Sequence, residues 1–307
     1  MQRLRSALLA GLVFAAAAIV LHDSAGRSAD AQTAAPASQT ILHAARVSAS
    51  DLEVGGELAG LPAGSTRYIT REDLLVLPQV SYRVTGDVNF GGPTQVSGVT
   101  LEELANRLGA VPNADLVVAV CDDAYRANYP RAYIAAHRPL LVLEIDGKPP
   151  SGWPKSADGG DMGPYMISHP KFTPSFRVLA HTDEAQIPWG VIRLEFRDEK
   201  EVFGAIAPRG ADANGAAVQA GYRIAQQNCF HCHNMGSEGG QKSGLSWQVL
   251  ATWASGSPDF FAAYVRDPKS KNARAQMPGH PNYDDATVRA LIAYFGTFSS
   301  ATTAEKP

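Results

Sequence analysis

"QQNCFHCHNMG", residues 226–236, contains the spacing Cys-x-x-Cys-His, formed by Cys229, Cys232 and His233. Two cysteines at this spacing can bind zinc, cycle between dithiol and disulfide, or hold a haem through two thioether bonds. A zinc site needs four ligands, and the chain has neither a second cysteine pair nor a His-x₃₋₅-His pair after the motif. The choice between the other two depends on the secondary structure around the motif.

The block around the motif reads as helical. Val218, Tyr222 and Ala225 share one face of a helix that ends at Cys229. Two more helices are predicted, one from Ser257-Pro258-Asp259 to Asp267-Pro268 and a last one beginning at Asp284 or Asp285. No strand pattern intervenes. A redox dithiol of the thioredoxin type follows a strand in an α/β setting, whereas a histidine directly after the second cysteine is typical of covalent haem attachment. The pattern therefore favours haem, with His233 as an axial ligand.

The sixth iron ligand is expected further along the chain. Met235 is too close to His233 to reach the opposite face of the macrocycle. Met277 lies on a helix-free stretch, residues 272–282, beside Pro278, and a thioether ligand there would raise the reduction potential. His280 is the competing ligand.

Residues 213–297 resemble a class I cytochrome c. The resemblance rests on "AGYRIAQQNCFHCH", "YVRDPKSKNARAQMPGH" and "ATVRALIAYF". It implies an all-α domain with one covalent haem c, and a close crossing of the first and last helices at Gly221 and Tyr294 or Phe295. The family usually has Gly-Pro-x-Leu after the motif, whose proline carbonyl holds the haem histidine. Here the nearest stretch, residues 243–245, is Ser-Gly-Leu, so the acceptor for His233 stays open.

The N-terminus indicates export. Arg3 and Arg5 precede an apolar run from Ala7 to Leu21, which is short for a membrane span, and Ala29-Asp30-Ala31 suits a signal peptidase. We predict a signal peptide over residues 1–31 and a periplasmic mature protein with no membrane span. The alternative is an uncleaved anchor. A disordered stretch, rich in Ala, Gln, Thr, Ser and Pro, is predicted over residues 32–45.

Composition supports two ordinary globular domains. The chain has 307 residues, is 45% hydrophobic and 19% charged, and has a formal net charge of −3. This charge argues against nucleic acid as a partner. We predict an α+β domain over residues 46–207, a linker over 208–215, the cytochrome c domain over 216–298 and a tail over 299–307. Strands are expected at 116–121, 140–145, 176–180 and 191–196, and a helix between a capping box at Thr100–Glu103 and Gly109.

The first domain resembles, more faintly, the molybdopterin domain of the sulfite-oxidase family. The stretches that carry this resemblance are "TREDLLVLPQV", "VSGVTLEELANRLGA", "VAVCDDAYRANYP", "LLVLEIDGKPP" and "MGPYMIS". The family's metal-binding cysteine would fall within residues 79–98, and that interval has no cysteine. Cys121 is expected to be a small buried residue at a strand end, and Asp122 and Asp123 to raise its pKa. The alternatives for Cys121 are a metal ligand outside the family's pattern or a redox-active thiol. His169 and His181 are weaker ligand candidates.

The two resemblances together predict an exported monohaem cytochrome that carries single electrons. Its sulfite-oxidase-like domain would lack molybdopterin and would dock a partner or position the haem. The alternative is a haem-molybdenum oxidoreductase acting on a small oxyanion such as sulfite, and a third reading makes the first domain a ligand-binding module that gates electron flow. Arg266, Lys269, Lys271 and Arg274 cluster just before Met277, so an acidic redox protein is the expected partner.

Overall fold

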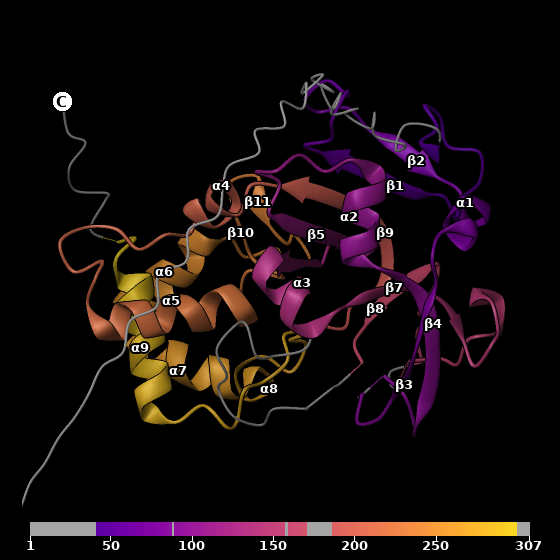
Figure 1. The fold of residues 1–307 in the computed structure, drawn as a ribbon. Coiled ribbons are helices and arrows are strands. Elements are labelled where there is room, and N and C mark those ends of the chain that lie inside the picture. Colours follow the sequence, from indigo (N-terminus) through magenta and orange to yellow (C-terminus); the bar gives the residue numbers. More distant parts are fainter. Residues whose placement is uncertain (1–40, 88, 157–158, 171–185, 300–307) are drawn as a thin grey trace, which may run out of the picture. The chain divides into compact units, whose positions relative to one another are not determined.

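The structure is a computed structural model that describes residues 41–299 except 88, 157–158 and 171–185 (Figure 1). All of these residues belong to one compact unit, Pro36–Pro307. A sheet region comes first in the chain and a helical region second. This agrees with the two-domain arrangement expected from the sequence, an α+β block followed by an all-α block. The predictions for the signal peptide, the strand at 176–180, His181 and residues 300–307 lie outside the described residues.

The sheet region is built on nine described strands. The hydrogen-bonded order is β2-β1-β9-β8-β7-β4-β3, and β5 pairs with both β9 and β6. All pairs are antiparallel except β1 with β9, which run parallel. The strands are β1 (Leu52–Gly56), β2 (Arg67–Ile69), β3 (Val80–Val84), β4 (Thr94–Thr100), β5 (Leu116–Cys121), β6 (Arg126–Pro130), β7 (Leu140–Ile145), β8 (Tyr165–Ser168) and β9 (Trp189–Arg197).

Strands β5, β7 and β9 confirm three of the apolar strand predictions, those at 116–121, 140–145 and 191–196. Strand β5 is buried on both faces, because its side chains alternate between two cores. Val117, Ala119 and Cys121 belong to the core of the sheet region. Leu116 and Val118 instead join the core built by the helical region.

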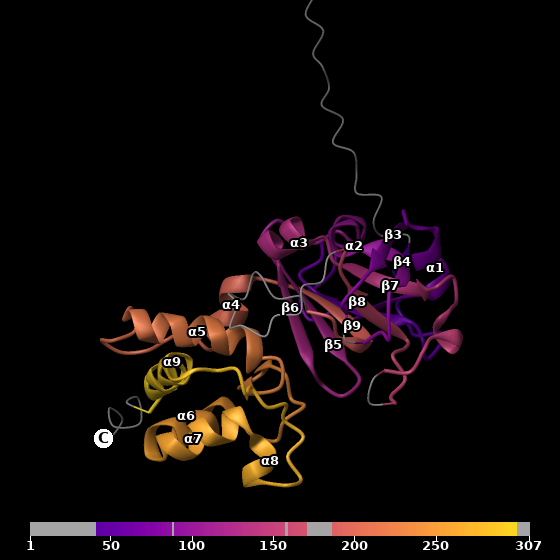
Figure 2. The same ribbon diagram turned by 90° about the horizontal axis from the view of Figure 1, so that it is seen from below.

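Short helices flank the strands: α1 (Arg71–Val76), α2 (Leu101–Leu108), α3 (Arg131–His137), the 3₁₀ turn η2 (Pro150–Gly152) and α4 (Glu199–Gly204). Figures 1 and 2 show α2 and α3 beside each other along the sheet. Helix α2 begins after Thr100 and ends at Gly109 in the left-handed conformation, as predicted. The predicted capping box is only half formed, since Thr100 accepts from the Glu103 amide without a return bond from Glu103. A complete box is on α1, between Thr70 and Asp73.

The helical region contains five described helices, four of which gather around a common core (Figure 2). They are α5 (Ala216–Asn228), α6 (Trp247–Gly256), α7 (Pro258–Arg266), α8 (Pro268–Lys271) and α9 (Asp285–Gly296). Helices α5 and α9 cross closely at Gly221, where a Cβ would stand 2.0 Å from the Ala290 carbonyl oxygen and 2.7 Å from the Tyr294 Cβ. This confirms the predicted close crossing at Gly221, and of the two aromatic candidates, Tyr294 and Phe295, it is Tyr294 that meets Gly221.

Three details differ from the sequence predictions. The helical region contains a small hairpin, β10 (Asn234–Met235) with β11 (Glu238–Gly239), because Gly236 and Gly239 adopt positive φ and turn the chain back. Helix α6 was not predicted. Residues 41–45, expected to be disordered, include His43, which pairs through its backbone with Tyr68.

Candidate functional site

Helix α5 ends in the Cys-x-x-Cys-His motif. The Cys229 amide donates to the Ala225 carbonyl at 2.9 Å, and the Cys232 and His233 amides donate to the Cys229 carbonyl at 3.2 and 2.9 Å. Beyond this last turn, both thiols and the imidazole line one cavity. Cys229 and Cys232 are not joined in a disulfide. The structure therefore brings together the three residues of the motif.

The His233 imidazole is fixed by a local brace. Its Nδ1 donates to the Leu245 carbonyl at 2.6 Å, the Leu245 amide donates to the Ser243 hydroxyl at 3.1 Å, and the Ser243 amide donates to the Cys232 carbonyl at 3.0 Å. With Nδ1 protonated, Nε2 has a free lone pair for a metal. Burial lowers the pKa of His233, which also favours the neutral ring. The acceptor left open by the missing proline is thus Leu245.

The motif's thiols are protonated at neutral pH. Burial, followed by the neighbouring Cys232, raises the pKa of Cys229 to about 12. Burial raises the pKa of Cys232 to about 11, and the effect of nearby Asp123 is in the same direction while that of Lys242 opposes it. Because the thiolate is the stronger nucleophile, these thiols are slow nucleophiles in this setting.

The motif opens on a cavity of about 610 Å³. Both thiols, His233 and Met277 line it, together with apolar side chains such as Phe295. This volume falls in the range of ordinary cofactor sites, and the donor set combines an oriented imidazole with a thioether and two thiols. The residues therefore fit a haem c.

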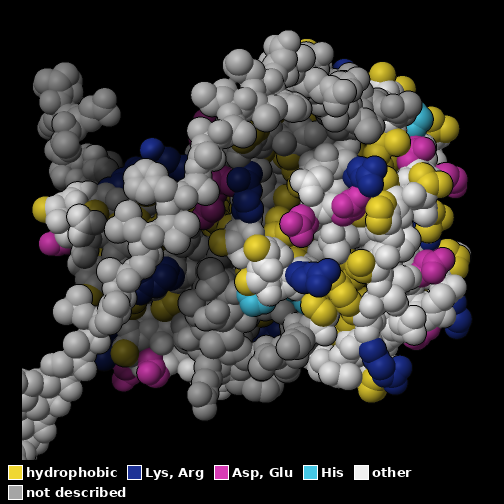
Figure 3. Space-filling model, in the orientation of Figure 1, with side chains coloured by type: hydrophobic (Ala, Val, Ile, Leu, Met, Phe, Trp, Pro, Cys, Tyr) yellow, Lys and Arg dark blue, Asp and Glu magenta, His cyan; other side chains and the backbone are white. Residues whose placement is uncertain are grey.

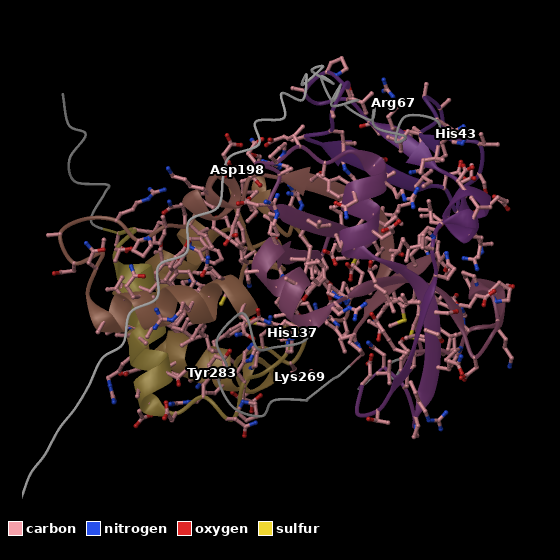
Figure 4. The ribbon with its side chains drawn as sticks, in the orientation of Figure 1. His43, Arg67, His137, Asp198, Lys269 and Tyr283 are labelled. Atoms are coloured by element: carbon pink, nitrogen blue, oxygen red, sulfur yellow. The ribbon has the colours of Figure 1, made fainter. Side chains whose placement is uncertain are left out.

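The loop before α9 carries both predicted candidates for the sixth ligand. Met277 is half-buried and packs against the core of the helical region. His280 also lines the cavity, but its ring stacks on Tyr283 at 4.5 Å between centroids, and burial lowers its pKa. Tyr283 is labelled in Figure 4, with Lys269 of α8. The stack on Tyr283 already gives the His280 ring a packing partner. Met277 has a more flexible side chain, so it is the better candidate for the sixth ligand.

The hairpin β10–β11 lies directly against the motif. A Cβ at Gly240 would stand 1.7 Å from the His231 carbonyl oxygen. A Cβ at Gly239, whose φ is +85°, would stand 2.6 Å from both the His233 carbonyl oxygen and the Phe230 ring. Only glycine fits this close approach of two backbones. The pair Gly239-Gly240 in the sequence was the signal that could have indicated it.

The basic segment before Met277 is only partly free to meet a partner. Arg266 pairs with Asp285 at 2.7 Å and also donates to the Tyr283 carbonyl. Lys269 lines a second cavity, about 600 Å³, beside Met277, and Lys242 lines it from the motif side. On the face shown in Figure 3, basic and acidic side chains are interspersed. Lys242, which the sequence analysis missed, thus belongs to the same surface as Lys269.

The sheet region's candidates do not form a metal site among the residues the structure describes. Cys121 is buried at the end of β5, as predicted, and burial followed by Asp123 and Asp122 raises its pKa. His169 is buried against Tyr133, whose hydroxyl lies 2.8 Å from its Nε2. In the described part of the chain, no group of three His, Cys, Asp or Glu side chains is arranged to hold a metal ion. Cys121 instead lines the cavity of about 610 Å³ beside the motif.

Comparison with known proteins bears most directly on the helical region. The family model described as "Cytochrome C oxidase, cbb3-type, subunit III" matches residues 216–295. Among solved structures, the crystal structure of the sulfane dehydrogenase SoxCD from Paracoccus pantotrophus is similar at 16% identity and a TM-score of 0.32. That similarity covers 55% of this chain and 45% of the SoxCD chain, so less than half of the latter is spanned. A sequence search of curated proteins gives no match.

The family match supports electron transfer as the role of the helical region and implies haem c. Cytochrome c domains generally exchange electrons with a redox partner and are typically exported. Within the described ranges, no helix combines the length and the apolar character that crossing a membrane requires.

Proposed function

We propose that this chain is an exported, periplasmic electron-transfer protein with one haem c. Cys229 and Cys232 would hold the haem covalently, and His233 and Met277 would ligate its iron. When bound, the haem supplies a one-electron couple. The observation that carries the proposal is the cavity of about 610 Å³ on which the two thiols, the braced imidazole and the thioether all open.

Each residue has a distinct task in this proposal. The two thiols anchor the group, and Leu245 orients the imidazole through its carbonyl. Met277 offers a soft sulfur, which favours the reduced iron and so a positive potential. Phe295 and the other apolar side chains of the cavity keep water from the redox centre.

The sheet region completes the proposal as a sulfite-oxidase-like domain that works without molybdopterin. Its role is to position the haem or dock a partner. The absence of a cysteine in residues 79–98 supports this reading over a haem-molybdenum enzyme acting on sulfite. Metal analysis separates the two, because iron alone is expected here, and iron with molybdenum near one to one would establish the enzyme.

The attachment test uses full-length protein matured in a host that makes c-type cytochromes. Denatured wild type should keep haem peroxidase staining on a gel, and the Cys229→Ala/Cys232→Ala variant should lose it. Cys121→Ala is the matched control and should stain like wild type. Haem that leaves the wild type on acid-acetone extraction would refute covalent attachment.

The ligand test compares Met277→His with Met235→Leu. The ferric wild type should show the weak thioether-to-iron absorption band of His/Met ligation. Met277→His should abolish the band and lower the potential, because imidazole stabilises ferric iron more than a thioether does. Met235→Leu should leave both unchanged. A wild-type spectrum without the band would move the assignment to His280 or to an open site.

A further inference from the structure

The Cys-x-x-Cys-His motif is fastened to the sheet region through its own inner residue, His231. The Arg126 amide donates to the His231 carbonyl at 3.0 Å, and His231 Nδ1 donates back to the Arg126 carbonyl at 2.6 Å. His231 is 4% exposed. Two reciprocal bonds to one residue fix the motif's backbone and the ring of His231 at the start of β6.

The ring of Tyr125 covers the same spot. It stacks on the His231 ring with centroids 5.0 Å apart and planes inclined by 25°. Tyr125 also lines the cavity on which the motif opens. The Lys242 ammonium lies 5.9 Å from the Tyr125 ring centroid and pairs with Asp123, a distance at which a cation is attracted to an aromatic ring. Tyr125 therefore contacts both the motif and a cation from the helical region.

The β5–β6 turn, residues 122–125, is itself held in place. The Gln241 amide donates to the Ala124 carbonyl at 2.9 Å. Ala124 has a φ of 65°, a conformation that non-glycine residues adopt only when their surroundings hold them there. Beyond the turn, Arg126 donates to the Ser237 carbonyl at 3.2 Å, and Arg197 pairs with Glu238 at 2.8 Å. These contacts surround the motif on the side of the sheet.

We propose that the β5–β6 turn is a built wall of the haem cavity and that Tyr125, as part of this wall, raises the reduction potential by keeping water out. The inference rests on the proposed function and deepens it. Oxidised haem carries one more positive charge than reduced haem, and water stabilises the more highly charged form. A ring that keeps water from the cavity therefore favours reduction. In this arrangement the sheet region tunes the redox centre without binding a metal of its own.

The test is a redox titration of full-length, haem-loaded protein followed by absorption. Tyr125→Ala should retain the haem stain and shift the reduction equilibrium about tenfold toward the oxidised form, which is about 59 mV for one electron. Tyr125→Phe keeps the ring and should stay within about threefold of wild type. Tyr82→Ala removes a tyrosine of the sheet region that does not line this cavity, and should change nothing.

Amide hydrogen exchange gives a second test, because it measures how firmly the β5–β6 turn is held against the motif. The Arg126 and Gln241 amides, which bond between the turn and the motif side, should exchange faster in Tyr125→Ala and at the wild-type rate in Tyr125→Phe. If Tyr125→Ala does not accumulate, Tyr125→Leu serves the same test, since it lacks a stacking plane. Wild-type potential in a haem-loaded Ala or Leu variant would overturn the inference while leaving the proposed function intact. Wild type without attached haem would instead overturn the proposed function.

Discussion

The sheet region and the helical region use their interiors differently. The sheet region packs apolar side chains against one another, with Leu52, Leu104 and Phe196 among those fully buried. The helical region arranges its aromatic and aliphatic side chains around a cavity, which the motif's two thiols, His233 and Met277 line. A small domain built this way relies on its cofactor for much of its core. The difference teaches that stability in the sheet region depends on its own side chains, and stability in the helical region on the proposed haem as well.

The largest expected effect is a loss of stability in the helical region, caused by Gly221→Ala. The new Cβ would meet the Ala290 carbonyl oxygen at 2.0 Å, so α5 and α9 must separate. We expect a loss of about 3 kcal/mol from this overpacking. Thermal unfolding followed by haem absorption should report the loss. Gly296→Ala, at the end of α9, has open space around its Cβ and is the control. Equal stability of the two variants would contradict the close crossing.

The second prediction concerns the sheet region, whose stability should fall in acid because of buried His169. Burial, followed by nearby His137, lowers the pKa of His169 from 6.5 to about 3. The folded state therefore favours the neutral ring. The contribution of neutral His169 to the free energy of unfolding is complete above the ordinary histidine pKa and is lost as the pH falls toward the folded-state pKa. The loss is about 1.4 kcal/mol per pH unit, or about 2 kcal/mol near pH 5.

The measurement is denaturant unfolding of wild type and His169→Gln at neutral pH and near pH 5, followed by tryptophan fluorescence. The variant can still bond to Tyr133 and should lose most of the acid sensitivity. His137→Gln removes only the smaller cause of the lowered His169 pKa and should retain most of the acid sensitivity. An unchanged pH dependence in His169→Gln would show that another group governs the acid response of the sheet region.

The smallest expected effect on the free energy of unfolding comes from the helix N-termini of the sheet region, where the starts of α1 and α2 can be compared. At α1, burial would raise the pKa of Asp73, but hydrogen bonds from Thr70 and His43 outweigh it and lower the pKa below 3.8. This stabilisation is present above the ordinary carboxyl pKa and is lost as the pH falls through the lowered value. Thr70→Ala should cost about 1 kcal/mol at neutral pH and less in acid. Thr100→Ala, at a half-formed box, should show less pH dependence in the same unfolding assay, and the reverse order would contradict the capping argument.

Local signals in the sequence predicted the elements that local chemistry determines. The runs LVVAVC and LLVLEI are apolar and rich in β-branched residues, and they form β5 and β7. Thr100, Gly109, Pro258 and Asp284 mark helix ends in the structure as they do in the sequence. Helix α6 had a usable signal that was missed, since Trp247, Leu250, Ala251 and Ala254 are buried at helical spacing.

The remaining features depend on contacts between distant residues. The stack of Tyr125 on His231 joins two positions far apart in the chain. His231 lies inside the Cys-x-x-Cys-His motif, but nothing in the sequence pairs it with Tyr125. The same holds for Lys242 with Asp123. Leu245 acts through its carbonyl, so its side chain gave no indication of the role. Such residues can be recognised only once the fold brings them together.

The two braces of the motif also differ in how early the chain can make them. His233 reaches Leu245 across 12 residues, whereas His231 reaches Arg126 across 105. Closing the longer loop costs about 2 kcal/mol more in chain entropy. Contacts between residues close in sequence form faster, so we expect the His233 imidazole to be oriented before the bond between His231 and Arg126 is made. A chain that receives its haem during maturation would then present a correctly turned histidine before its final contacts are complete.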